Sequence, residues 1–141
     1  VQAAVPHHGV YDIAGTTRTR SAVYIRDEFF GPKVMRQTYA EAPELFEAAS
    51  PLLRVTEDAP DFFIIHGASD TLVSPEHARA MVARLREVSR RTVVYAELPG
   101  AQHAFDVFTS VRSAHVVRAV ARYLAWHHAR RRASAPQVRA S

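Results

Sequence analysis

Two residues of complementary chemistry, Asp70 and His103, each follow a predicted strand of this chain. Asp70 comes after the apolar run 62–65 and a glycine turn, and His103 comes after a second predicted strand, 92–98. In acyl transfer, a carboxylate orients an imidazole, and the imidazole moves the proton of a serine. Asp70 and His103 are therefore predicted to be the acid and the base of a hydrolytic site.

The elements around these two residues are predicted to be neighbours in a parallel sheet. Four large apolar residues closed by His66-Gly67 are too few for an ordinary helix and are typical of a central strand covered on both faces. Ser74 is the predicted N-cap, and Pro75 the first residue, of an amphipathic helix that runs to Ser89. Two strands joined by one crossover helix are parallel, so their C-terminal loops open at the same edge.

The rest of the chain extends this pattern to a three-stranded parallel α/β unit. A short strand is expected at 1–6, helical excursions with helices at 22–30 and 43–49 fill the region before the second strand, and a last helix covers about 112–129. We expect one structured domain, 1–129. The arginine-rich residues 130–141 are expected to be a disordered, solvated tail.

Composition excludes several classes of protein. With 48% hydrophobic and 23% charged residues, the chain of 141 residues is expected to be a soluble globular protein. It has no cysteine, hence neither disulfides nor thiolate chemistry. No stretch approaches the roughly 18 apolar residues of a membrane span, and no aromatic residues interleave with the arginines as nucleic-acid binding requires. We expect a cytoplasmic protein without a cofactor.

Several residues have a functional and a structural interpretation. Taken singly, Asp70 could be a turn residue and His103 a loop histidine; together they favour the catalytic pair. Asp106 is too close to His103 along the chain to orient it. Phe105 and Phe108 are candidates for a substrate pocket and equally for plain core.

Two histidine pairs, His7-His8 and His127-His128, could in principle ligate a metal. Adjacent side chains point to different faces, and no carboxylate lies at ligand spacing. We therefore assign no metal from the sequence.

The stretches 66–74 and 98–105 resemble the C-terminal half of the α/β-hydrolase fold, in the esterase and lipase branch related to hormone-sensitive lipase. The stretches 9–12 and 49–52 also look like that branch, so the resemblance covers about residues 1–128. It implies that Asp70 follows the family's seventh strand and His103 the eighth. Residues 1–6 would be the sixth strand.

The family's serine elbow, G-x-S-x-G, and its His-Gly-Gly oxyanion loop do not occur in this sequence. We therefore expect part of a serine carboxylic ester hydrolase whose nucleophile lies outside the chain, acting on a small ester. The alternatives are a prolyl-oligopeptidase-type peptidase and an inactive fragment or binding module. The chain starts at Val1 without an initiator methionine, which suggests a fragment or a processed chain. The expected partner is the N-terminal half that carries the serine, or a second copy paired through the first strand.

Overall fold

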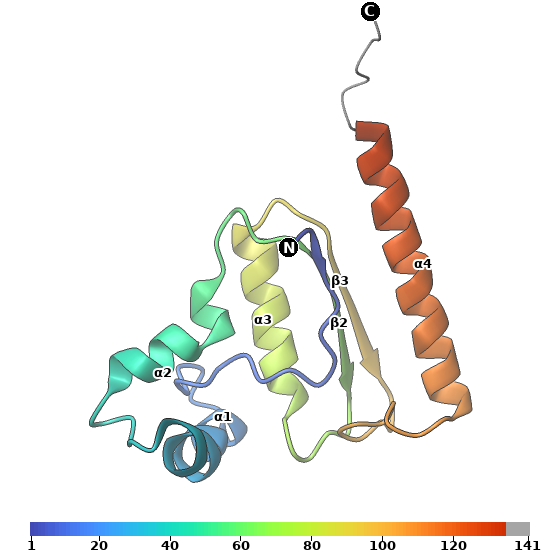
Figure 1. The fold of residues 1–141 in the computed structure, drawn as a ribbon. Helices are drawn as coiled ribbons and strands as arrows, with labels where there is room; N and C mark the ends of the chain where they lie inside the picture. The colour runs from blue at the N-terminus through green and yellow to red at the C-terminus, as the bar shows by residue number, and fades with distance from the viewer. Residues whose placement is uncertain (135–141) are drawn as a thin grey trace, which may run out of the picture. The chain divides into compact units, whose positions relative to one another are not determined.

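The computed structural model describes residues 1–134. The chain forms two compact units, Val1–Phe105 and Asp106–Ser141. The first contains a small sheet and all helices up to α3, and the second contains the long helix α4 (Val111–Ser134) (Figure 1).

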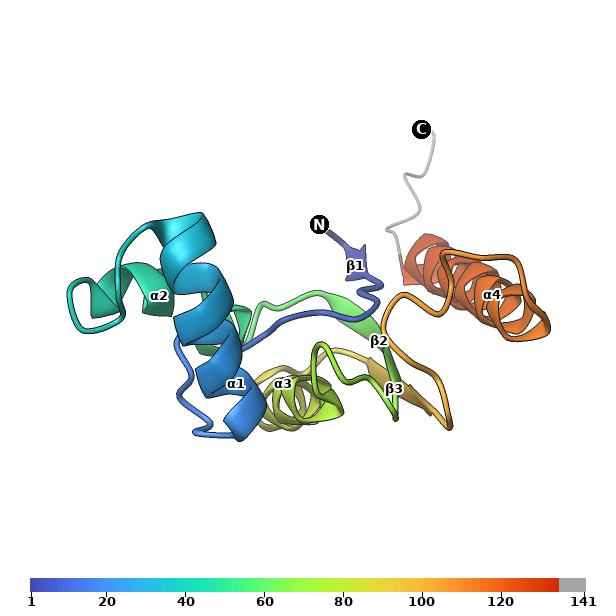
Figure 2. The ribbon, with the colours of Figure 1, turned by 90° about the horizontal axis from the view of Figure 1, so that it is seen from below.

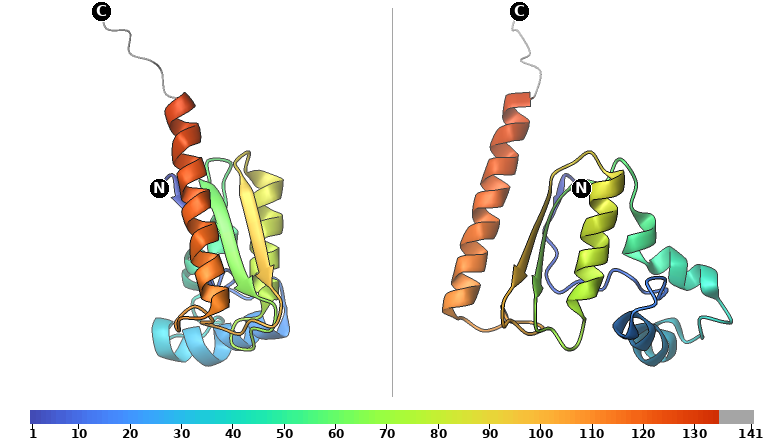
Figure 3. Two further views of the ribbon diagram at one scale, coloured as in Figure 1. Left: turned by 90° about the vertical axis from the view of Figure 1, so that its right-hand side faces the viewer. Right: turned by 180° about the vertical axis from the view of Figure 1, so that it is seen from behind.

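The sheet of the first unit has three parallel strands. They are β1 (Ala3–Ala4), β2 (Asp61–Gly67) and β3 (Val93–Leu98), in the order β1-β2-β3. The arrows of β2 and β3 point in the same direction in both views of Figure 3. The predicted α/β class, with three parallel strands and flanking helices, is confirmed.

The first strand is shorter than the expected range 1–6. Pro6 has no backbone N–H to donate, which interrupts the ladder after Ala4. The chain nevertheless stays beside β2, because Ile65 N donates to Pro6 O (3.1 Å), and His7 forms an isolated parallel bridge with Ile65. This keeps the loop after β1 next to the carboxyl end of β2.

The helices begin near the predicted positions, but two of them end later than predicted, and the second of these is α4, described below. The region expected as a helix at 22–30 is helical from Arg20 to Met35, first as α1 (Arg20–Tyr24) and then as the π-helical η1 (Ile25–Met35). After it come α2 (Pro43–Ala49) and the 3₁₀ turn η2 (Pro51–Arg54).

Helix α3 (Pro75–Val88) connects β2 to β3. The hydroxyl of Ser74 accepts a hydrogen bond from Glu76 N, and Pro75 is the first helical residue, as the sequence predicts. The helix lies between the sheet and α1 when the first unit is viewed from below (Figure 2).

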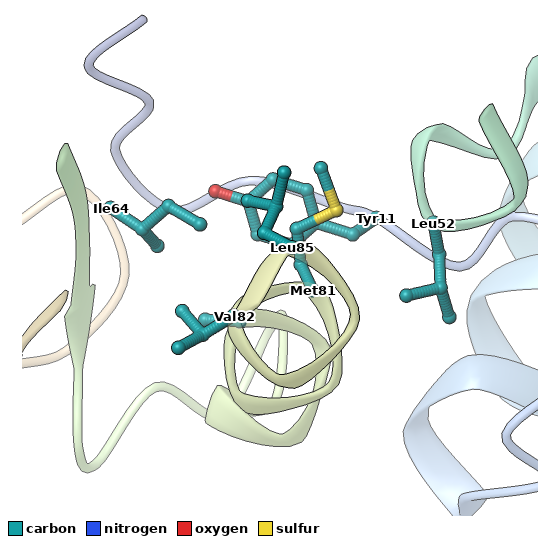
Figure 4. Close-up of a cluster of buried hydrophobic side chains, with 7 residues drawn as sticks. Tyr11, Leu52, Ile64, Met81, Val82 and Leu85 are labelled. Carbon is teal, nitrogen blue, oxygen red and sulfur yellow. The ribbon is translucent and has the colours of Figure 1, made fainter. Parts of the chain in front are cut away.

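The main core lies between β2 and α3. Ile64 of β2 packs with Met81, Val82 and Leu85 of α3, and Tyr11 and Leu52 complete the cluster (Figure 4). Full burial of such side chains contributes about 1.5–3 kcal/mol each. The cluster thereby holds α3 against the strand whose end carries Asp70.

Asp12 is a fully buried carboxylate that organises the loop after β1. Its two oxygens accept hydrogen bonds from the backbone N–H and the hydroxyl groups of both Thr16 and Thr17, at 2.6–3.1 Å. Burial acts to raise the pKa of Asp12, but these four hydrogen bonds outweigh it and lower the pKa below its usual value. The role of this aspartate is therefore structural.

Helix α4 forms most of the second unit. It continues through Arg130–Arg132 to Ser134, residues that the sequence assigned to the tail. The remaining part of that predicted tail, 135–141, lies outside the described residues. Within residues 1–134, no helix combines the length and the apolar character that crossing a bilayer needs.

Candidate active site

The loops that follow β2 and β3 are joined by backbone hydrogen bonds. Ala68 N donates to Leu98 O (2.9 Å) and Ser69 N donates to Ala101 O (3.0 Å). Gly67 permits this approach, because a Cβ atom at its position would lie 2.4 Å from Ala101 O. The loop of the predicted acid and the loop of the predicted base are thus held together by their main chains.

Asp70 lies in the turn after β2, and its side chain is completely buried. Oδ1 accepts hydrogen bonds from the backbone N–H of Leu72 (3.0 Å) and of Val73 (2.8 Å). Oδ2 lies 2.8 Å from Nδ1 of His103. The carboxylate is therefore fixed by its own loop on one side and faces the imidazole with its other oxygen.

His103 lies in the loop after β3, and its side chain is 31% exposed. Because a carboxylate only accepts hydrogen bonds, the contact with Asp70 requires the proton of the imidazole on Nδ1. In the neutral ring, Nε2 then keeps its lone pair and can accept a proton. The following residue, Ala104, has a left-handed backbone (φ 55°), which turns the chain directly after the imidazole.

A second histidine, His66, lies at the end of β2 beside the carboxylate of Asp70. Its Nε2 lies 2.8 Å from Val73 O and 3.3 Å from Asp70 Oδ2. Since Val73 O can only accept, Nε2 carries the proton, and burial lowers the pKa of His66, which keeps the ring neutral. His66 and Asp70 thus bind the same residue, Val73, one through its carbonyl and the other through its N–H.

A third histidine, His8, lies beside the base. It comes from the loop after β1, where its backbone is left-handed (φ 52°) and its N–H donates to Ile65 O (3.2 Å). Its ring centre is 5.1 Å from that of His103 and 4.8 Å from that of Phe105. Ligand atoms of His8, Asp70 and His103 all lie within 4.8 Å of one another, the spacing of a group that could hold a metal ion.

The sequence predicted the contact between Asp70 and His103 but not the places of His66 and His8. The signal for His66 is its position at the end of a buried strand, three residues of which, Phe63, Ile64 and Ile65, are core residues. The local sequence contains no such signal for His8. This residue reaches the site because β1 pairs with β2, which places the loop after β1 beside the end of β2.

The two predicted pocket residues lie in different units. Phe105 is partly buried and belongs to the first unit, where its ring contacts His8. Phe108 belongs to the second unit and is 80% exposed. A role as plain core is therefore wrong for Phe108, while its role in binding substrate stays a prediction.

No serine hydroxyl among residues 1–134 hydrogen-bonds to His103. Ser69 is exposed in the acid loop, and Ser74 caps α3. Ser110 and Ser113 hydrogen-bond with each other before and within the start of α4. Among the described residues, Asp70 and His103 are thus in contact, and no serine hydroxyl is hydrogen-bonded to the imidazole.

Comparison with known proteins identifies the family of this chain. The sequence profile of the prolyl oligopeptidase family matches residues 2–130. Esterase LipQ of Mycobacterium tuberculosis is 44% identical over 131 residues, which cover 93% of this chain and 30% of that protein. The probable carboxylic ester hydrolase LipM of the same organism is 44% identical over 126 residues, covering 89% of this chain and 28% of that protein.

Solved structures show the same fold. The butyrate-bound esterase Est2 of Thermogutta terrifontis aligns with a TM-score of 0.68 at 16% identity, over 89% of this chain and 43% of that chain. The chain spans about 30% of the length of the curated relatives it matches. The esterase resemblance predicted from the sequence is confirmed by these relatives. The chain belongs to the prolyl oligopeptidase family of α/β-hydrolase proteins, and it corresponds to the C-terminal part of a hydrolase domain whose curated relatives are esterases.

Proposed function

We propose that this chain supplies the acid, Asp70, and the base, His103, of a Ser-His-Asp triad in a carboxylic ester hydrolase. The serine and the oxyanion hole belong to residues outside these 141. One observation carries the proposal: the buried Oδ2 of Asp70 lies 2.8 Å from Nδ1 of His103, on two loops that backbone hydrogen bonds join.

In this reaction Nε2 of His103 takes the proton of the serine hydroxyl while the serine oxygen attacks the ester carbonyl. The imidazolium then protonates the departing alkoxide, and the same nitrogen activates the water that hydrolyses the acyl-enzyme. Asp70 holds the ring in the tautomer with the proton on Nδ1 and stabilises the imidazolium as it forms. It does so from a carboxylate that two backbone N–H groups already fix.

The proposed substrate is an ester of modest size. We assign Phe105, which lies next to the ring of His8 in the first unit, as a contact of the acyl group. Phe108, which is exposed in the second unit, stays the second candidate for a substrate contact. No nucleic acid is expected as a partner.

The proposed partner is the segment that carries the serine elbow. β1 pairs with β2 on one side. No strand among residues 1–134 pairs with its other edge, which could therefore accept a strand from another segment. An open edge beside a sheet presents unpaired N–H and C=O groups. A strand of the N-terminal half of the hydrolase would satisfy them, and a second copy of β1 is the alternative.

The test is to sequence the gene upstream of Val1 and to express the longer product that contains an in-frame G-x-S-x-G. Hydrolysis of p-nitrophenyl butyrate by this protein is expected to fall by about 10³-fold or more in His103→Ala and in Asp70→Asn. His128→Ala, an exposed histidine of α4, is the matched control and is expected to retain the activity. Full turnover in either of the two site variants would show that the assigned roles are wrong.

A peptidase is the second candidate, since the matching family is named for prolyl oligopeptidase. The same acid and base would serve a peptide substrate. Comparing kcat/KM for p-nitrophenyl butyrate and for a proline-containing peptide anilide separates the two. A preference for the peptide by tenfold or more would favour the peptidase, and absence of turnover for both would favour an inactive module.

A further inference from the structure

We infer that His8, Asp70 and His103 form a binding site for a divalent transition-metal ion such as Zn²⁺. One ligand atom from each residue lies within 4.8 Å of the others. The three residues come from the loops after β1, β2 and β3, which open at the same edge of the sheet. No carboxylate lies at ligand spacing from His8 along the sequence, but the folded chain brings Asp70 close to it.

The relative position of the two imidazoles fits a zinc ion. With metal–nitrogen distances of about 2.0 Å and tetrahedral angles, the ring centres of two histidine ligands lie about 5 Å apart. The ring centres of His8 and His103 are 5.1 Å apart, with their planes at 51°. Small side-chain rotations suffice to bring the ligand atoms from their present spacing onto one ion.

The third ligand is preorganised. Oδ1 of Asp70 is held by the N–H groups of Leu72 and Val73, which directs Oδ2 toward His103. His66 Nε2 lies 3.3 Å from the same Oδ2 and acts as the outer hydrogen-bond partner that ligating carboxylates usually have. The ion would take the place of the proton between Nδ1 of His103 and Oδ2 of Asp70, so binding releases that proton.

The donor set selects the kind of ion. Two imidazole nitrogens and one carboxylate oxygen suit Zn²⁺, Cu²⁺ or Ni²⁺, whereas Mg²⁺ prefers an all-oxygen octahedral shell. Three protein ligands leave the fourth position of a tetrahedral Zn²⁺ ion to water. Zn²⁺ is therefore the appropriate probe, and Mg²⁺ the appropriate negative control.

An ion bound here would prevent acid–base catalysis, a consequence that rests on the proposed function. Coordination through Nδ1 breaks the hydrogen bond to Asp70 that sets the tautomer. The neutral ring then carries its proton on Nε2, so Nε2 has no lone pair for the serine proton. His103 cannot act as the base, and ester hydrolysis stops until the ion leaves.

Binding is tested on the 141-residue chain without any activity assay. Isothermal titration with Zn²⁺ is expected to show one site, and titration with Mg²⁺ none. The variant is His8→Asn, because asparagine tolerates the left-handed backbone of His8 and lacks the imidazole ligand. It is expected to weaken Zn²⁺ binding roughly tenfold or more, while His128→Ala leaves the affinity unchanged.

Nuclear magnetic resonance gives the independent measurement. Zn²⁺ is expected to shift the ring signals of His8 and His103 together, at the same stoichiometry as the calorimetric site. Equal Zn²⁺ affinity in His8→Asn and the wild-type chain, equal loss in His128→Ala, or unshifted His8 and His103 signals would each overturn the site. An inactive longer protein would refute the proposed function and leave these results standing.

Discussion

Replacing Gly67 with alanine tests how the loop of Asp70 is joined to the loop of His103. The new Cβ would lie 2.4 Å from Ala101 O and 2.8 Å from Ala101 C, both backbone atoms that cannot rotate away. Gly67 is not among the glycines with positive φ, so the substitution adds a steric clash and no backbone strain. We expect the free energy of unfolding to fall by about 2–3 kcal/mol, typical of overpacking at a closely packed position.

The measurement is urea denaturation of Gly67→Ala beside Ser69→Ala. Ser69 is exposed in the same loop, so its variant controls for changes in that loop and should lie within about 0.5 kcal/mol of the wild type. The clash also separates Asp70 from His103, which the downfield Nδ1–H signal of His103 reports. Wild-type stability together with an unchanged Nδ1–H signal in Gly67→Ala would refute the reasoning that this close approach positions the pair.

Three further predictions concern residues around the site. Ala104→Gly is expected to raise the free energy of unfolding by up to about 1 kcal/mol, because glycine relieves the left-handed backbone; a loss of stability measured in urea would contradict this. Asp12→Ala should cost roughly 3 kcal/mol because it removes the acceptor of four hydrogen bonds from Thr16 and Thr17, whereas the exposed control Asp58→Ala should cost almost nothing in the same assay. Burial lowers the pKa of His77 in the folded chain, so the unfolded chain binds the proton at a higher pH, and the free energy of unfolding should fall as the pH drops below about 6.5. Urea titrations at pH 7.5 and 5.5 should show a smaller difference in this free energy for His77→Asn than for the wild type.

The parts of the site that could be predicted depend on local sequence patterns. Asp70 and His103 follow strands whose boundaries are visible in the apolar runs, and parallel topology then requires their loops to meet. Ser74 and Pro75 marked the start of α3 for the same reason, because capping chemistry is local.

What could not be predicted depends on contacts between distant segments or on unusual backbone. His8 reaches His103 because β1 pairs with β2, a strand far along the chain, and because the backbone of His8 is left-handed. The left-handed conformation falls on His8 itself and not on the glycine that follows it, so the sequence does not signal it. The length of η1 was missed because Gly31-Pro32 normally ends a helix, and here the chain continues in π-helical form to Met35. The Zn²⁺ ligand set was missed because its carboxylate is contributed by another strand.

The backbone hydrogen bonds between the loop of Asp70 and the loop of His103 have a consequence for how the sequence can change in evolution. Because Ala68 and Ser69 donate, and Leu98 and Ala101 accept, through peptide groups, the geometry of the pair does not depend on those four side chains. Substitutions of the exposed Ser69 can therefore change the surface of the loop at little cost to these hydrogen bonds, whereas Gly67 must stay small. The relative placement of Asp70 and His103 can persist while the exposed side chain beside them changes.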